Sequence, residues 1–440
     1  MGRERLTALG RVALLAAALS MGTAAHPPEG ALAGRAVGPD GSAFVDTFDG
    51  SPERPAPFRS PHWDVTLFSH DPSLLYAPLH THAGHGDDCA PPPATHRVSS
   101  AEEAIFQCRD HVMTAVDASM EFSPYHGMYA AAVLTPDHLL DFSRGEARLS
   151  FDLSTERAAR FDWVDVWLSP YDEHHQAPGT DGRRPVANYL PGAHWLTVSL
   201  TQDARGGRFR VSQRAPYHQY RDGFGGGPLP VADATSYADV LEPSAARRDT
   251  FELRISRTHI KVGMPAYDLW WVDTEMDDLG WDRAVVQLGH HFAPLDPSVC
   301  PGGRPQPACA ANTWHWDNVA LEPAVPFTIL PADRAQVDQS APAGVRFERP
   351  APANAHLRFL AAGAPIEVSV DGGETWVPAR TRFDFPRQPG LLAYWTPLPA
   401  GVTSVQLRGQ EWGFANGPEG ERYGWVARSI SVWAPPEAQS

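Results

Sequence analysis

One segment carries residue types that are suited to holding a sugar: Phe161–Leu168, which reads FDWVDVWL. Successive side chains of an extended strand point to opposite faces. The alternation places Trp163, Asp165 and Trp167 together, opposite an apolar face. Indole faces stack on the C–H groups of a sugar ring, and a carboxylate between them accepts hydrogen bonds from hydroxyls. The spacing predicts a ligand-binding surface; the alternative is a small secondary core beneath loops.

Two other segments divide their residues in the same way. In the hairpin 250–262 and in the strand 284–291, apolar residues alternate with polar ones. If the polar faces coincide with that of the tryptophans, they line one polar, aromatic groove. If they do not, they form a solvated outer face with ordinary cross-strand ion pairs. The polar residues in question are Glu252, Arg254, Gln287 and His291.

Such a groove has residues for two different reactions on a polysaccharide. A glycosidase needs two carboxylates a few ångströms apart, and Asp165 and Glu252 are the available pair. A polysaccharide lyase needs a group that neutralises a uronate and a base, for which Arg254, Gln287 and His291 provide the types. Catalysis by Asp165, Glu252 or His291 therefore stands as an alternative to binding alone.

The segments that position these residues are short and extended throughout the chain. Runs of period-two alternation, bounded by Gly, Pro, Asp and Ser, recur from residue 43 to residue 435. With 37 Gly and 43 Pro in 440 residues, the composition is typical of a loop-rich, all-β protein. Pro323 and Pro326 mark a boundary, which predicts a large sandwich over 43–322 and a small β-sandwich accessory domain over 323–435.

The strand that ends the larger unit reads NTWHWDNVAL and spans Asn312–Leu321. Strict alternation puts one set of five residues on one face and the remaining residues on the other. The first set is Thr313, His315, Asp317, Val319 and Leu321, and the second includes Trp314, Trp316, Asn318 and Ala320. We interpret it as a closing strand whose aromatic residues fill an end of the sandwich.

The N-terminal residues predict export. Three arginines precede a short apolar run, Val12–Ser20, and small residues follow before His26, as in a signal peptide over residues 1–25. A flexible tail is expected over 26–42. Signal removal lowers the formal net charge from −16 to about −18. So acidic a chain disfavours nucleic acid as a partner, and no membrane span is expected after signal removal.

The chain has four cysteines, an even count that favours disulfides in an exported protein. Proximity in sequence suggests the pairs Cys89–Cys108 and Cys300–Cys309, although three connectivities are possible.

The early strand FVDTFDG (Phe44–Gly50), the late strand HWDNVAL (His315–Leu321) and about a dozen alternating strands between them resemble the concanavalin A-like lectin/glucanase superfamily. The resemblance covers about residues 43–322 and implies a jelly-roll of two curved antiparallel sheets, with carbohydrate bound or cut on the concave sheet. Laminarinase-type members carry two catalytic Glu around an Asp on one strand. The closest strand here, Asp162–Leu168, contains no Glu.

The same resemblance implies a structural calcium near the first and last strands. Asp46, Asp49 and Asp317 offer the hard oxygen ligands that calcium prefers.

A second local motif lies in the C-terminal part. Ser369–Trp376, SVDGGETW, resembles the Asp-box turn of sialidase propellers, and we interpret it as a structural hairpin turn. Asp371 is expected to accept backbone hydrogen bonds, and Gly372 and Gly373 to adopt positive φ angles.

The sequence thus predicts a secreted, extracellular protein that binds a polysaccharide or glycan on the concave face of a jelly-roll. A polysaccharide-degrading hydrolase or lyase that uses the same groove, and a structural or adhesion protein of the cell surface, are the alternatives.

Overall fold

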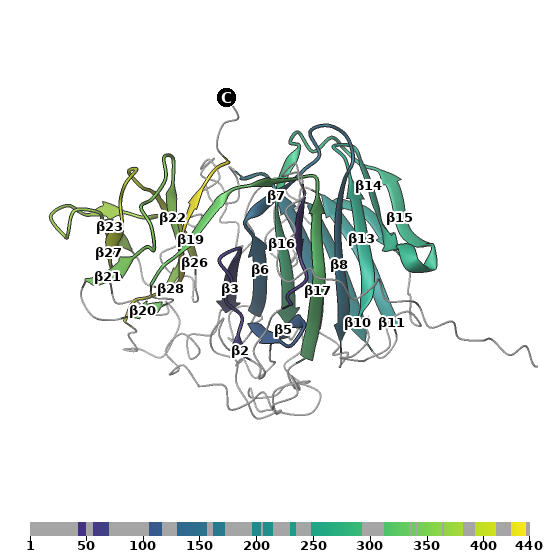
Figure 1. Cartoon of the computed structure of the whole chain (residues 1–440), viewed down its shortest axis with the longest axis horizontal. Helices are drawn as coiled ribbons and strands as arrows, with labels where there is room; N and C mark the ends of the chain where they lie inside the picture. The colour runs from purple at the N-terminus through teal and green to yellow at the C-terminus, as the bar shows by residue number, and fades with distance from the viewer. Residues whose placement is uncertain are drawn as a thin grey trace, which may run out of the picture. The chain divides into compact units, whose positions relative to one another are not determined.

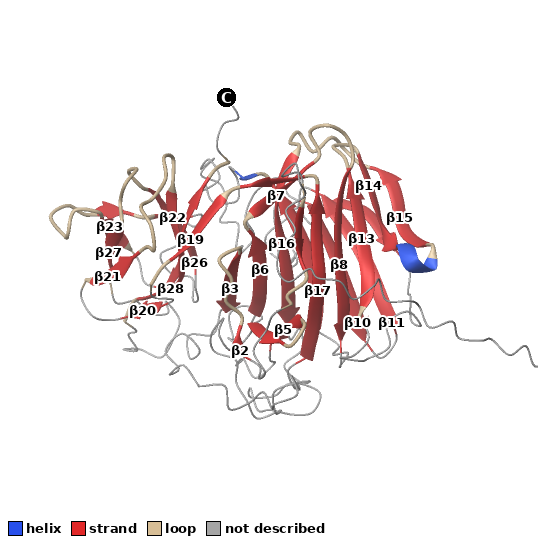
Figure 2. Cartoon of the chain, viewed as in Figure 1, coloured by secondary structure: helices blue, strands red, loops and turns tan. Residues whose placement is uncertain are grey.

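The computed structural model describes part of the chain, and its elements are β-strands and a short 3-10 turn, Pro265–Tyr267 (Figure 2). This confirms the all-β prediction. None of the described residues forms a helix long and apolar enough to cross a membrane. The predicted signal peptide and most of the predicted tail lie outside the described residues. The described residues are 43–49, 56–69, 105–116, 130–155, 162–171, 196–203, 206–213, 229–234, 248–292, 312–333, 336–338, 342–362, 365–381, 392–410 and 424–436.

A first antiparallel sheet carries the closing strand near its middle, and several of its strands run side by side in Figure 1. Strand β1 (Phe44–Asp46) joins it by pairing with β17. In spatial order its other strands are β15 (Leu269–Glu275), β14 (His259–Met264), β13 (Asp249–Ile255), β8 (Ala147–Thr155), β17 (Asn312–Glu322), β5 (His111–Val116), β4 (Ile105–Cys108) and β2 (Ala56–Pro57).

A second antiparallel sheet carries the Trp-Asp-Trp strand, β9, at its centre. In spatial order its main strands are β12 (Leu229–Ala234), β11 (Gly206–Gln213), β10 (Leu196–Asp203), β9 (Asp162–Ser169), β16 (Arg283–Phe292), β6 (Ala130–Pro136) and β3 (Trp63–Ser69). Two short strands, β7 (His138–Asp141) and β18 (Ala324–Pro326), extend it beside β16.

The two sheets pack face to face around one hydrophobic core, in the concanavalin A-like jelly-roll architecture that the resemblance implies. Leu149, Phe251 and Trp316 of the first sheet and Val166 and Leu288 of the second contribute to this core. Each strand supplies every second residue, as the period-two pattern predicts. For either sheet, we call the face turned away from this core its outer face.

Strict alternation fails at one place in the closing strand. Trp314 and Trp316 lie in the core, but so do Val319 and Leu321, which the alternation placed on the opposite face. The cause is a β-bulge at Asn318, whose φ of 47° is left-handed and where the pairing with β8 shifts register. The extra residue reverses the parity of everything that follows it.

The C-terminal sandwich comprises two further sheets and its own core. One sheet is ordered β19 (Thr328–Pro331), β28 (Val426–Ala434), β22 (His356–Ala362), β26 (Leu392–Pro397) and β25 (Arg380–Thr381), with β20 (Gln336–Asp338) beside β28. The other is ordered β21 (Ala343–Arg346), β27 (Ser404–Arg408), β23 (Glu367–Ser369) and β24 (Val377–Pro378). Leu357, Phe359 and Val432 of one sheet pack with Val345 and Leu407 of the other.

The SVDGGETW turn joins β23 to β24 and has the expected hydrogen bonds. The Asp371 carboxylate accepts hydrogen bonds from the backbone N–H of Thr375 at 2.9 Å and from the Ser369 hydroxyl at 2.7 Å. Gly372 and Gly373 have φ angles of 79° and 98°. These hydrogen bonds hold the pKa of Asp371 far below its usual value. The motif is a hairpin turn, as the sequence analysis interprets it.

Candidate functional site

The strand pairing brings five of the predicted ligand-binding residues together on two central strands. Strands β9 and β16 pair so that Trp163 lies opposite His291, Asp165 opposite Gly289, and Trp167 opposite Gln287. Residues directly opposite each other share a face of the sheet. Because Val164, Val166 and Leu288 alternate with them and lie in the core, these pairs belong to the outer face of the second sheet. We call the three pairs the ladder site.

One end of the ladder site is buried. Trp167 and Gln287 are only 2% and 1% exposed, and Gln287 donates from Nε2 to the hydroxyl of Thr135 on β6 at 3.3 Å. Neither side chain offers a face to solvent here. The residue opposite Asp165 is a glycine, so no side chain from β16 stands across the middle of the ladder site.

The predicted shared groove is wrong in one respect. Arg254 and Glu252 lie on β13 of the first sheet, between core residues Phe251, Leu253 and Ile255. They therefore occupy the outer face of the first sheet and share no surface with Gln287. Alternation predicted their side of the strand but not the sheet that contains the strand. For the same reason Asp165 and Glu252 do not form a pair of carboxylates.

On the first sheet, Glu252 forms ion pairs as in the alternative interpretation, one along β13 with Arg254 and one across to Arg148 on β8. Glu252 is buried and contacts Arg254 at 2.6 Å and Arg148 at 3.5 Å. Arg254 and Lys261, the chain's single lysine, both lie over the ring of Trp270, 5.2 and 4.4 Å from its centroid. These contacts account for the residue types without a ligand.

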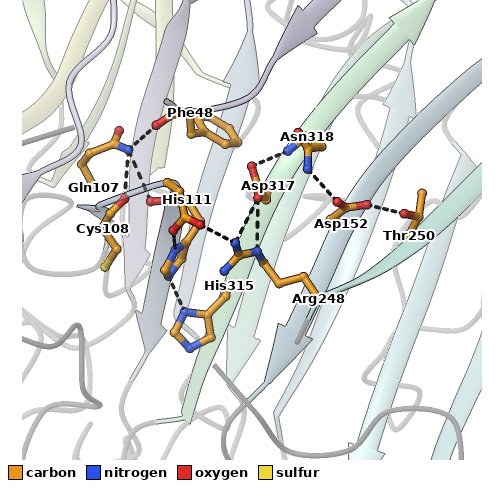
Figure 3. A network of polar contacts seen from close by, with 11 residues as sticks. Phe48, Gln107, Cys108, His111, Asp152, Arg248, Thr250, His315, Asp317 and Asn318 are labelled. Carbon is orange, nitrogen blue, oxygen red and sulfur yellow. Dashed lines mark hydrogen bonds and ion pairs between the residues drawn. The ribbon is translucent and has the colours of Figure 1, made fainter. Parts of the chain in front are cut away.

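A polar network that the sequence analysis missed occupies the outer face of the first sheet (Figure 3). Asp110 Oδ1 lies 2.8 Å from His111 Nδ1, and His111 Nε2 lies 2.9 Å from His315 Nδ1. An ionised carboxylate only accepts, so His111 donates to Asp110 and, when neutral, accepts from His315. The hydrogen bonds thus run from an exposed carboxylate to a fully buried imidazole.

Arg248 joins this chain of hydrogen bonds to the bulge of the closing strand. Its guanidinium lies 2.9 Å from Asp110 and 3.2 Å from Asp317. Asp317 also accepts from the backbone N–H of Asn318 at 2.8 Å, and the amide of Asn318 donates to Asp152 at 2.7 Å. The network therefore fixes the bulge from the outer side of the sheet (Figure 3).

Burial sets the protonation of this network. Burial, together with the charges of His111 and Arg248, lowers the pKa of His315 to about 3. Burial raises the pKa of Asp317 to about 7, although Arg248 opposes the shift. Burial would also raise the pKa of Asp110, but the hydrogen bond from His111 and the charge of Arg248 lower it overall. Near pH 6 the His315 imidazole is therefore neutral and the Asp317 carboxyl is mostly protonated.

A third buried histidine, His290 on β16, does not belong to this network. Its Nδ1 is 3.2 Å from the Thr114 carbonyl oxygen, and its ring packs edge-on against Trp314. His290 is thus a buried structural histidine between the sheets, whereas His315 faces outward. The sequence did contain one signal for the missed network. His111 and His315 each lie next to core residues of their own strand, so both belong to the face turned away from the core.

The three aspartates expected to bind calcium do not converge. Asp46 accepts from Trp63 Nε1 at 2.7 Å and from the Phe48 backbone N–H at 2.8 Å. Asp46 is paired with core residue Val319, whereas Asp317 faces outward to Arg248 and Asp49 is exposed. No group of three metal-ligating side chains is found within the described stretches. These residues therefore do not fit one common calcium site.

The cysteine predictions mostly concern segments outside the described residues. Cys108 is buried with Phe106 and Met113, and the stretches that are described contain no free cysteine. Cys89, Cys300 and Cys309 are not among them, so both predicted pairs stay predictions.

No family model matches the chain, and no curated protein matches it. Among solved structures it is similar to LamA of Zobellia galactanivorans in complex with laminaritriose and laminaritetraose, at 10% identity and a TM-score of 0.37, covering 66% of this chain and all of that one. It is also similar to the catalytic domain of a laminarinase from Thermotoga petrophila (10%, TM-score 0.37, covering 63% and 95%) and to a Bacillus licheniformis β-glucanase (8%, TM-score 0.31, covering 64% and 98%).

Proposed function

We propose that this chain is an exported carbohydrate-binding protein and that the ladder site contacts the saccharide. One observation carries the proposal: three alternate cross-strand pairs have two tryptophans, a carboxylate, an imidazole and an amide on one face of a central strand pair. Of the two indoles, Trp163 is the one proposed to stack on a sugar ring, because Trp167 is buried at the other end of the site.

Each residue has a role that follows from its type and register. Trp163 provides a flat apolar face, and Asp165 accepts hydrogen bonds from sugar hydroxyls where Gly289 leaves room. His291 lies opposite Trp163, at the end of the site away from Trp167. Trp167 and Gln287, which are buried, form the closed end of the site and hold the neighbouring strands together.

Binding is favoured over turnover because the residues needed for catalysis are divided between two sheets. Glu252, the second carboxylate of the possible hydrolase, and Arg254, the uronate-neutralising residue of the possible lyase, both lie on the outer face of the first sheet and are therefore not part of the ladder site. The ladder site thus keeps one carboxylate, Asp165, whereas a glycosidase needs two.

A structural or adhesion role is the second candidate, and one observation favours it. Most of the described outer-face residues on the central strands of the second sheet are buried, although Arg283 at the start of β16 is exposed. A covered face is expected where a sheet supports other parts of a protein. The buried residues of this face include Asp64, Thr66, Val133, Thr135, Trp167, Val285 and Gln287.

A glycan array followed by calorimetry tests the proposal. We expect Trp163→Ala to weaken binding of any detected glycan by about ten-fold or more, equivalent to about 1.4 kcal/mol. Trp270→Ala, on the outer face of the first sheet, is the matched control and should bind as the unaltered protein does. Unchanged binding by Trp163→Ala, or no glycan bound at all, would reject the site. Product analysis of each bound glycan detects turnover.

A further inference from the structure

The C-terminal sandwich touches the outer face of the second sheet beside the ladder site. Asp64, on β3, is paired there with Arg358 of β22, whose Nη1 lies 3.0 Å from the Asp64 carboxylate. Both side chains are nearly fully buried, 8% and 9% exposed. The Arg358 guanidinium stacks 4.4 Å from the ring centroid of Trp433, and the Ser431 hydroxyl also hydrogen-bonds to Asp64.

An apolar cluster continues this contact along β16. Val285 packs with Phe327, Ile329 and Trp433, three residues of the C-terminal sandwich and the segment leading into it. Val285 precedes Gln287 by two residues on the same face, a separation of about 7 Å. The C-terminal sandwich therefore begins one residue row beyond the buried end of the ladder site.

Both courses that a saccharide could follow end at this contact. Along β9, a chain that lies over Trp163 and Asp165 next meets the buried Trp167 and, beyond it, the cluster around Val285 and Tyr171. Across the strands, the row that starts at Trp167 runs through Gln287 and Thr135 to Asp64, where Arg358 covers it. Displacing Arg358 would leave a buried carboxylate without its charge partner, so the obstruction is fixed.

We infer that the C-terminal sandwich closes the ladder site at one end, so that the site accepts the terminus of a saccharide chain and not an internal stretch of a polymer. This inference rests on the proposed function. The expected ligand class is therefore an oligosaccharide, or the chain ends of a polysaccharide.

The test compares binding to the same polymer with few and with many ends. A soluble β-1,3-glucan, a β-1,4-glucan and a polyuronate are each offered to the full chain at equal sugar mass, once intact and once cut to about one tenth of their length. End recognition predicts that binding per sugar mass rises about ten-fold on cutting, in proportion to the number of ends. Equal binding to intact and cut polymer would overturn the inference while leaving the proposed function standing. Binding to neither form would reject both.

A variant tests the obstruction itself. Removing both partners in Asp64→Ala/Arg358→Ala avoids leaving a buried charge, and it should raise binding of intact relative to cut polymer by roughly three-fold or more. Glu367→Ala/Arg408→Ala is the matched control, because Arg408 also pairs with a carboxylate, at 2.7 Å, and stacks on a tryptophan, Trp376. A folded double variant with an unchanged ratio of binding to intact and to cut polymer would refute the role of the Asp64–Arg358 contact in closing the site. If the double variant does not fold, the comparison of intact and cut polymer decides alone.

Discussion

Two residues of the polar network respond to pH in opposite directions. The pKa of His315 is about 3 in the folded chain against 6.5 unfolded, so its contribution to stability is present above pH 6.5 and is lost as the pH falls toward 3. The pKa of Asp317 is about 7 against 3.8 unfolded, so its contribution is present below pH 3.8 and is lost as the pH rises through 7. Between pH 5 and 7 the two effects offset each other.

Asp317→Asn should expose the acid sensitivity of His315. This variant lacks the carboxyl group whose ionisation offsets the effect of His315. Acidification from pH 7 to pH 5 should therefore lower the free energy of unfolding by about 2 kcal/mol, because the His315 imidazole takes up a proton in the unfolded chain and stays neutral in the folded chain. The unaltered protein should change much less over this range. Urea unfolding at the two pH values measures the difference.

His315→Asn provides the mirror-image control. It removes the imidazole and retains Asp317, so acidification over the same range should raise the free energy of unfolding. Parallel pH profiles for the unaltered protein and both variants would contradict the assigned protonation states.

At this scale the sequence predicts which residues share a face but not which sheet contains them. Trp163, Asp165 and Trp167 share their face with Gln287 and His291, because alternation along a strand is local. Arg254 obeys the same alternation and yet lies on the other sheet. Strand order depends on contacts between residues far apart in the chain, which no local pattern contains.

At the scale of elements, the bulge of β17 decides how the closing strand packs. Trp314 and Trp316 before it and Val319 and Leu321 after it all reach the core because one extra residue, Asn318, stands between them. The strand was predictable from its β-branched and aromatic residues. The bulge was not, since the Asp152 and Asp317 contacts that stabilise it come from the folded sheet.

Deleting Asn318 should therefore disrupt the sandwich. The deletion would turn Val319 and Leu321 outward, and losing the burial of two such side chains costs about 3–6 kcal/mol. Asn318→Gly is the control: glycine adopts the φ of 47° without strain, so its cost should stay at about 1 kcal/mol. Thermal unfolding compares the variants. A deletion variant as stable as Asn318→Gly would show that the strand tolerates either register.

At the scale of the whole molecule, the C-terminal sandwich is tied to the jelly-roll by a buried ion pair within an apolar surround. Asp64 and Arg358 come from positions almost 300 residues apart, and no pattern in the sequence marks either of them as a partner. The prolines at 323 and 326 lie in the segment that passes from β17 through β18 of the second sheet to β19 of the C-terminal sandwich.

A double-mutant cycle measures how strongly this pair joins the two parts. Arg358→Ala alone leaves the Asp64 carboxylate buried and should cost about 3–5 kcal/mol, whereas Asp64→Ala/Arg358→Ala should cost less than the two single changes added together. The cycle at Glu367 and Arg408, which are 26% and 41% exposed, should give a coupling energy below about 1 kcal/mol. Chemical unfolding of the full chain yields both values. Equal coupling in the two cycles would mean that Arg358 is held by its packing on Trp433 and not by its charge.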